Sequence, residues 1–188
     1  TYGQLGDGST LPRLTPVRVT GLPNVTAIAT GMLSHFGSAI GTDGRVYGWG
    51  QNSNAQLGLG VTADQVTAVQ VPTVASARLL AAGSDYAVAL TGAGRGWAWG
   101  DTTTGALGVG PSANQYDRAP TPEQSDIGNV LSLSGGDNHT LAIRPDGAVL
   151  GFGQNNGKLG NGSTDEAIAG VVASGLVLAD NTWLSGDA

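Results

Sequence analysis

The feature that most constrains this chain is an internal repeat of about 50 residues. A short motif ending in Leu-Gly occurs four times, at steps of 52, 50 and 52 residues, in residues 3–6, 55–58, 105–108 and 157–160. An aromatic residue followed by glycine recurs with it, as Trp49-Gly50, Trp99-Gly100 and Phe152-Gly153. Landmarks that keep their spacing in successive copies indicate that each copy folds as one unit packed against its neighbours.

The residues between these landmarks predict a small antiparallel sheet. Residues 140–143 lead into Asp146-Gly147, where we expect a two-residue type I′ hairpin turn. In the returning strand of the first copy, Tyr47 and Trp49 flank Gly48, and this alternation is typical of a strand. We expect the small residues to let a neighbouring sheet approach closely. Two further apolar segments in each copy complete four strands; these segments are residues 17–19 and 69–71, and residues 25–28, 77–80 and 129–133.

The predicted fold is therefore all-β, with β-propeller blades of four-stranded antiparallel sheets. Residues 1–188 are expected to form a single propeller segment of about 3.6 repeats, a partial ring. The 32 glycines and the low charged fraction of 12% fit a turn-dense β chain. Both ends of the sequence cut through a repeat. We therefore expect a segment of a longer propeller, or one that packs against other chains supplying the missing blades.

The order of the landmarks resembles the regulator of chromosome condensation repeat. Its pattern of Gly, His, Ala-Leu, Asp-Gly, Trp-Gly, Asn and Gly-Gln-Leu-Gly is matched closely by residues 136–162. The copy around Trp99 is looser, because Tyr86 stands in place of the histidine and Ala93 in place of the aspartate. The resemblance covers essentially the whole chain. It implies a closed ring of about seven blades, and we expect a bacterial-type member of that family.

Charge and composition exclude several classes of partner. Eight basic residues against 14 acidic ones give a net charge of −6, and Lys158 is the one lysine. A duplex-binding surface needs clustered basic residues, so no nucleic acid is expected as a partner. Apolar stretches are too short to cross a bilayer, so no membrane insertion is expected. Cysteine is absent, which excludes disulfides and thiolate metal sites.

The histidines and the glycine-rich segment, which could in principle form a catalytic or cofactor-binding site, are better explained as structural residues of the repeat. His35 and His139 have nearly the same phase, and Tyr86 takes that place in the middle copy. A catalytic or metal-binding histidine is not usually exchangeable for tyrosine, so a packing role or a backbone hydrogen bond is predicted for both. Residues 57–60 lack the third glycine of a dinucleotide-binding loop. We predict no enzyme activity, no catalytic residue, no metal and no cofactor.

The four tryptophans are assigned in the same way. Trp49 and Trp99 are repeat landmarks and are expected in the core. Trp97 stands at an apolar position of the repeat and is expected to be buried too. Trp183 fits no landmark.

The departure from the repeat that points to a binding surface is a long connection at residues 110–120. It is at least two residues longer than its counterparts and contains Tyr116 and Arg118. Insertions in repeat folds lie in loops, often on the binding face, and tyrosine and arginine are enriched at binding hot spots. An ordinary variable loop is the alternative. Tyr116 and Arg118 are the predicted partner-binding residues.

A propeller without catalytic groups is best interpreted as a binding platform. The first hypothesis is a non-enzymatic protein-interaction or adhesion module that binds a protein partner. The alternatives are a guanine-nucleotide exchange factor for a small GTPase, and a secreted enzyme-inhibitor or glycan-binding propeller. An extracellular or cell-surface bacterial location is favoured over the cytoplasm. This assignment of function depends on analogy, because a fold does not imply one activity.

Overall fold

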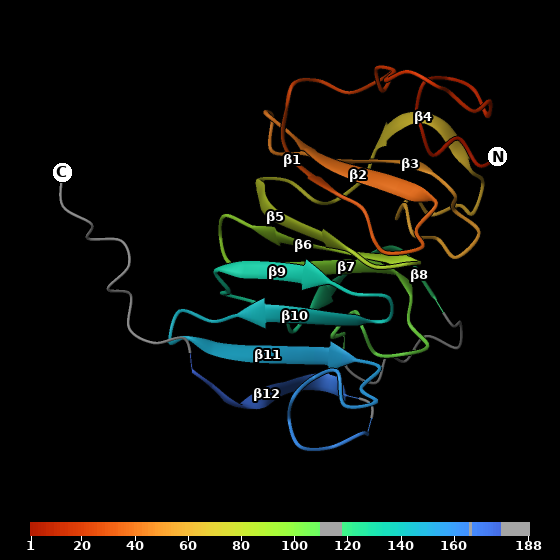
Figure 1. Ribbon diagram of the computed structural model, residues 1–188. Helices are drawn as coiled ribbons and strands as arrows, with labels where there is room; N and C mark the ends of the chain where they lie inside the picture. Colours follow the sequence, from red (N-terminus) through yellow and green to blue (C-terminus); the bar gives the residue numbers. More distant parts are fainter. Residues whose placement is uncertain (110–117, 166, 178–188) are drawn as a thin grey trace.

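The computed structural model describes residues 1–109, 118–165 and 167–177, which form three four-stranded sheets and no helix. The strands follow one another in sequence order (Figure 1). Their bounds are β1 (Val25–Ala29), β2 (Phe36–Gly41), β3 (Val46–Gly50), β4 (Gln65–Gln70), β5 (Ala77–Ala82), β6 (Tyr86–Thr91), β7 (Gly96–Asp101), β8 (Arg118–Ser125), β9 (Ser132–Gly135), β10 (His139–Ile143), β11 (Ala148–Gly153) and β12 (Ala167–Val177).

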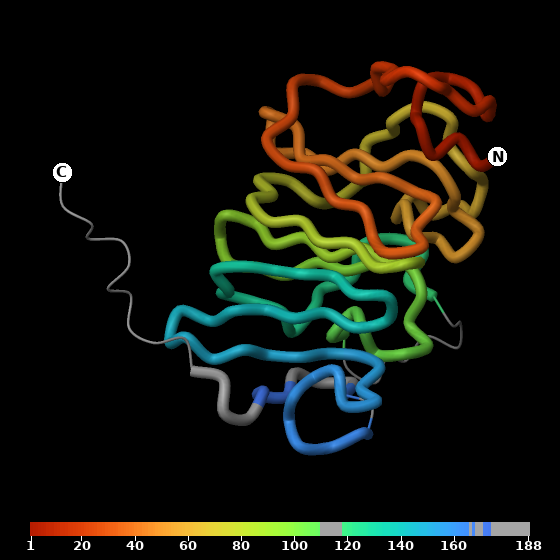
Figure 2. The backbone as a smooth tube through the Cα atoms, viewed as in Figure 1, coloured from red at the N-terminus to blue at the C-terminus, as the bar shows by residue number. Residues whose placement is uncertain are grey.

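Each sheet is an antiparallel meander in which a strand pairs with the strand before and after it. The three sheets stack in the order of the sequence, as the backbone trace in Figure 2 shows. Strand β5 contacts both β1 and β9, so the first strands of neighbouring sheets lie side by side. The prediction of an all-β fold built from four-stranded propeller blades is confirmed.

The hairpin turns differ from the predicted two-residue type. Within the pair Asp43-Gly44, only the glycine has a positive φ, of 73°. The amide of Gly44 donates to the carbonyl of Gly41, and the amide of Gly41 donates to the carbonyl of Arg45. This is a three-residue loop in which a turn is followed by a left-handed glycine. Asp146-Gly147 has the same pattern, because the amide of Gly147 donates to the carbonyl of Arg144 and only the glycine has a positive φ, so the type I′ turn predicted there was wrong. The turn role of the aspartate holds, because Asp43 Oδ1 accepts a hydrogen bond from the amide of Arg45.

The small residues of the third strand have a different use from the one predicted. A Cβ placed on Gly48 would lie 3.2 Å from Cδ2 of Leu57, the leucine of the Leu-Gly motif in the same sheet. Leu159 covers Gly151 in the third sheet in the same way. The side chains of Leu57 and Leu159 are fully buried. Gly48 and Gly151 therefore leave space for the motif leucine of their own blade, and not for the adjacent sheet.

A buried asparagine fixes each of these motif leucines. Asn52 Oδ1 accepts a hydrogen bond from the amide of Leu57, and its Nδ2 donates to the carbonyls of Val61 and Ala63. Asn155 makes the corresponding bond to the amide of Leu159. Because the asparagine is buried with its amide group bonded, it closes the connection between the third and fourth strands without leaving polar groups unpaired.

The glycine of the motif makes the contact between one sheet and the next. A Cβ on Gly58 would lie 2.7 Å from Cδ1 of Trp99, and the Nε1 group of Trp99 donates to the carbonyl of Gln56 at 3.0 Å. Trp99 therefore belongs to the second sheet but is fixed by the connection of the first. Gly6 meets Trp49 and Gly108 meets Phe152 in the same arrangement.

The landmark tryptophans are core residues as predicted. Trp49 and Trp99 are buried, with 8% and 0% of their surface exposed. Trp97 is only half-buried, so its predicted burial is partial, and Trp183 lies outside the described residues. Segment 17–19, which was expected to be a strand, forms none, because no third strand lies beside it in the described chain.

Replacing the motif glycine tests this contact between sheets. Gly58 and Gly60 both have positive φ, but a Cβ on Gly60 would meet nothing nearer than Thr121 Cγ2 at 3.5 Å. We expect Gly60→Ala to cost about 1 kcal/mol for its backbone conformation alone. Gly58→Ala should cost about 2–4 kcal/mol, because it also displaces Trp99. Urea unfolding of the two variants measures the difference, and equal losses would mean that the Gly58–Trp99 contact is not tight.

Candidate functional site

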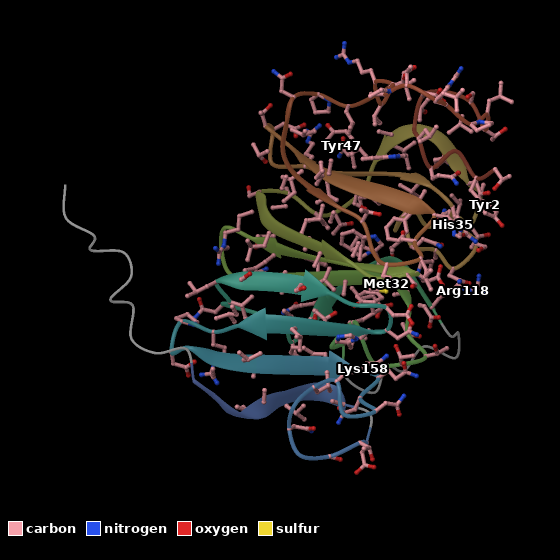
Figure 3. The ribbon with its side chains drawn as sticks, in the orientation of Figure 1. Tyr2, Met32, His35, Tyr47, Arg118 and Lys158 are labelled. Atoms are coloured by element: carbon pink, nitrogen blue, oxygen red, sulfur yellow. The ribbon has the colours of Figure 1, made fainter. Side chains whose placement is uncertain are left out.

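The loops that connect the first strand to the second and the third strand to the fourth meet at one end of the sheets, called here the loop end. The pairing of Phe36 with Gly50, of Tyr86 with Gly100 and of His139 with Gly153 fixes this arrangement. Figure 3 shows the labelled residues spread over the three sheets. Tyr2 and His35 lie close together beside the first sheet, Met32 and Arg118 lie below them in the view, and Lys158 is lower still, beside the third sheet. Tyr47 lies apart from them, at the upper left of the view.

The two residues predicted to bind a partner have different outcomes. Tyr116 lies outside the described residues. Arg118 is the first residue of β8, and its Nη1 group donates to the carbonyl of Ser53 at 2.7 Å. Ser53 belongs to the β3–β4 connection of the first sheet, so Arg118 joins two sheets at the loop end. Arg118 is half-buried, and its role in binding a partner stays a prediction.

A half-buried carboxylate lies beside this contact. Asp85 Oδ1 accepts a hydrogen bond from Nε2 of Gln56, a buried side chain in the connection of the first sheet. Burial raises the pKa of Asp85, and the negative charges of Asp101 and Asp137 raise it further. Hydrogen bonding from Asn54 and the neighbouring His35 act in the opposite direction. Three carboxylates therefore interact at the loop end, which also carries Arg118 and Lys158.

The β1–β2 loop is the most prominent apolar feature of this end. Paired residues Ala29 and Ser38 are nine positions apart, whereas Ala81 and Val88 of the second sheet are seven apart. The third sheet also has a separation of seven. The two additional residues present an exposed tip, in which 72% of Met32 and 78% of Leu33 are exposed and Leu33 has a φ of 61°.

This apolar tip is fixed to the neighbouring sheet. Ser84 Oγ lies within hydrogen-bond distance of the carbonyl of Met32, at 2.8 Å, and of the carboxylate of Asp137 in the third sheet, and its one hydroxyl proton serves these two acceptors. The amide of Ser84 donates to the carbonyl of Asp137. Within the loop, Ser34 Oγ accepts from the amide of Phe36. Sequence reasoning missed Met32 and Leu33. The signal was the spacing between the first and second strands, which is two residues longer in the first copy.

The two histidines are not equivalent. The register aligns His139 with Tyr86 and with Phe36, so His35 stands one position earlier, where the other sheets have Asp85 and Asn138. His35 is exposed, and its ring makes an edge contact with Tyr2 at 5.2 Å between centroids. The nearly equal phase of the two histidines therefore corresponds to adjacent positions of the repeat, one position apart.

His139 packs against the backbone of its own loop. A Cβ on Gly136 would lie 2.1 Å from its ring, and Nδ1 is buried with no hydrogen-bond partner in the described structure. Burial lowers the pKa of His139, and the positive charge of Lys158 adds to this effect. The backbone carbonyl of His139, and not its ring, accepts the hydroxyl of Tyr86 at 2.5 Å. Burial raises the pKa of that tyrosine to about 12.

In the ranges given above, no three or more His, Asp or Glu side chains are gathered so that they could hold a metal ion. In the same part of the chain, no helix has the length and apolar character needed to cross a membrane.

Comparisons of the sequence and fold agree with the repeat. The family model described as "Regulator of chromosome condensation (RCC1) repeat" matches residues 43–90 and 93–143, and a second model of that description matches residues 130–157. The human "Probable E3 ubiquitin-protein ligase HERC6" is 28% identical over 171 residues, which are 87% of this chain and 17% of that protein. The mouse "Regulator of chromosome condensation" is 37% identical over 71 residues, 37% of this chain and 16% of the mouse protein.

Solved structures show the same fold at low sequence identity. Prp20p from Saccharomyces cerevisiae, described with its binding properties to Gsp1p and histones, has a TM-score of 0.76 at 20% identity. That match covers 90% of this chain and 44% of Prp20p. Human WBSCR16 has a TM-score of 0.75 at 20% identity, over 91% of this chain and 44% of its own. Yeast RCC1 (Prp20) was also solved bound to Kap60. It matches with a TM-score of 0.74 at 18% identity, over 91% of this chain and 43% of its own.

The chain spans less than half of these solved propellers and less than a fifth of the sequence relatives named above. The named sequence relatives are from mouse and human, so the bacterial attribution stays a prediction.

Removing the charge of Asp85 tests the environment at the loop end. A folded-state pKa above the unfolded value means that the folded chain binds more protons than the unfolded chain above about pH 4. The charged carboxylate therefore lowers stability at neutral pH. We expect Asp85→Asn, which keeps the acceptor for Gln56, to unfold at higher urea concentration than the wild type at pH 7, with the gain disappearing below pH 4. Asp146→Asn in an exposed turn is the control and should show no such gain.

His139→Phe tests the unpaired nitrogen. The substitution restores the aromatic residue of the first copy and removes a buried, unsatisfied polar atom, so we expect a gain of about 1–2 kcal/mol. A lowered histidine pKa makes the folded wild type lose stability as the pH falls below about 6.5, so the gain should grow in acid. Unfolding curves at pH 5 and 8 measure it. A loss of stability at both values would show that the ring has a partner, and His35→Phe is the exposed control.

Proposed function

Because the chain belongs to the regulator of chromosome condensation (RCC1) repeat family, we propose that it is a non-enzymatic protein-binding β-propeller segment whose loop end contacts the partner. The yeast structures support this proposal, because one was solved bound to Kap60 and another is described with binding to Gsp1p and histones. The observation that carries it is the exposed Met32–Leu33 tip, which is held by a hydrogen bond to the neighbouring sheet.

The tip has the properties of an interaction anchor. Two large apolar side chains are exposed together, while the loop that carries them is already ordered by Ser34 and Ser84. A preorganised anchor loses little conformational entropy on binding, so more of the contact energy contributes to affinity. Apolar anchors surrounded by polar groups are the usual arrangement at the centre of an interface.

The surrounding charge indicates the kind of surface that fits the tip. Asp85, Asp101 and Asp137 interact electrostatically beside it, and the whole chain has a net charge of −6. The partner that these residues fit is a protein with an apolar pocket and a rim of lysine or arginine. Complementary charge of this kind mainly increases the association rate, and its effect decreases with added salt.

Replacing the tip tests the proposal. The immobilised wild-type chain should capture a partner from an extract of its source, and a Met32→Ser and Leu33→Ser double variant should lose it. Leu131→Ser is the matched control, because Leu131 is also apolar and 53% exposed but lies before β9 at the opposite end of the sheets. All three proteins should have the same Tm, since the changes are on the surface.

The same experiment separates the alternatives. Capture of a small GTPase that loses its nucleotide faster on addition of the chain would favour the exchange-factor alternative, and elution by free sugars would favour glycan binding. If the double variant and the control retain the partner equally, the loop end is not the binding surface.

A further inference from the structure

The connection between β11 and β12, at the loop end, contains both Asn-Gly pairs of the sequence, Asn156-Gly157 and Asn161-Gly162. An asparagine that precedes glycine can react without an enzyme, because the next main-chain nitrogen can attack its carboxamide. Glycine permits this approach since it has no Cβ to obstruct it. Because the two pairs have the same sequence, any difference in their reactivity has to come from the structure around them.

The first pair forms a tight turn. Asn156 and Gly157 have φ values of 42° and 82°, and the amide of Lys158 donates to the carbonyl of Asn155 at 2.6 Å. Positive φ at both central residues is the type I′ turn, for which Asn-Gly is the preferred sequence. The turn places the Asn156 side chain on the surface.

The turn is a consequence of a connection that is one residue shorter in the third sheet. Four positions separate Asn155 from Leu159, whereas five separate Asn52 from Leu57. In both sheets the asparagine side chain accepts a hydrogen bond from the amide of the leucine. The shorter connection therefore has to return to the same contact with fewer residues, and a two-residue turn achieves this.

The reacting groups of the first pair are unrestrained. In the part of the chain that the structure describes, neither the carboxamide of Asn156 nor the amide of Gly157 makes a hydrogen bond. A Cβ placed on Gly157 would meet no atom within 4 Å. A local rotation of the turn is therefore enough to bring the nitrogen of Gly157 to Cγ of Asn156.

The carboxamide of the second pair is held in place. Asn161 is half-buried, and its Oδ1 accepts from the amide of Ser163 at 3.2 Å and from Nδ2 of Asn155 at 3.0 Å. Asn155 is itself fully buried. Gly162 is as exposed and as open as Gly157, so the two pairs differ at the asparagine. Reaction at Asn161 requires these hydrogen bonds to open first.

We propose that Asn156 is a site of spontaneous modification, at which the folded chain converts asparagine into isoaspartate and aspartate while Asn161 stays intact. The nitrogen of Gly157 attacks Cγ of Asn156, the Cγ–Nδ2 bond breaks, and ammonia leaves with the amide proton of Gly157. Water then opens the resulting cyclic imide. Attack of water on Cγ gives aspartate, and attack on the main-chain carbonyl carbon gives isoaspartate, in which the chain continues through the side chain.

The modification changes the loop end in two respects. It places a carboxylate two positions from Lys158, whose positive charge contributes to the lowered pKa of His139. Isoaspartate also adds one carbon atom to the main chain of the turn. This turn leads into Leu159, which is buried and bonded through its amide to Asn155, so we expect the longer chain to weaken that contact. The proposal is independent of the partner that binds the loop end.

Mass spectrometry of the folded 188-residue chain after incubation at pH 8 tests the proposal. Trypsin cleaves after Lys158, so Asn156 and Asn161 enter different peptides. We expect deamidation at Asn156 to be about tenfold or more faster than at Asn161, because the second pair must first break its hydrogen bonds. Isoaspartate should be the main product. Asp-Gly pairs such as Asp43-Gly44 do not interfere, since their isomerisation leaves the mass unchanged.

The unfolded chain is the control for the effect of sequence. In concentrated guanidinium chloride the two rates should become similar, because both carboxamides are then free. Asn156→Gln should remove the fast reaction, and Asn161→Gln should leave it unchanged. Equal rates in the folded chain, a faster reaction at Asn161, or a difference that persists after unfolding would overturn the proposal.

The charge and the longer main chain can be separated by a variant. Asn156→Asp supplies the carboxylate alone, with an unchanged number of main-chain atoms. The purified isoaspartate form should therefore unfold at a lower urea concentration than Asn156→Asp. Equal midpoints of the two proteins would overturn the inferred effect on the Leu159 contact.

Discussion

The contact on which the whole structure depends is the close approach of a motif glycine to an aromatic ring of the next sheet. Gly58 leaves space for the edge of Trp99, and the indole then reaches the carbonyl of Gln56. A side chain larger than hydrogen would separate the two sheets, since interiors are packed without spare volume. The leucine next to this glycine turns the other way, onto its own blade at Gly48. One dipeptide therefore closes a blade and joins it to its neighbour.

Most of the fold was predictable from sequence because this contact needs particular residues at fixed spacing. Glycine, leucine and the aromatic residue recur together, and the structure places each of them in a buried contact. The predictions that were wrong concern the type of the Asp-Gly turn and the strand at residues 17–19. The Asp43-Gly44 turn is a three-residue loop because only the glycine adopts positive φ. Residues 17–19 are not a strand because strand formation needs a partner, which composition and phase do not reveal.

The loop end was predictable only in part, because the repeat does not constrain it. At one structural position the three sheets have His35, Asp85 and Asn138. No packing requirement selects among these residues, so periodicity carries no information about their roles. Arg118 was identified from an insertion, and it does reach the neighbouring sheet through Ser53. The Met32–Leu33 tip leaves only a small signal in the sequence, a spacing between the first and second strands that is two residues longer in the first copy than in the others.

Interior positions of the repeat are constrained by packing and loop positions are not, and this difference explains how one scaffold can bind different partners. Interior positions must reproduce the same contacts in each blade, since every sheet packs against the preceding one by the same groups. The loops lie outside this requirement, and a change there costs little stability. The half-buried Asp85 is a loop residue that is not free in this sense. Burial and the charges of Asp101 and Asp137 raise the pKa of its carboxyl group, which means that they destabilise its charged form. The same carboxylate accepts a hydrogen bond from the buried side chain of Gln56, so the fold itself constrains this loop position.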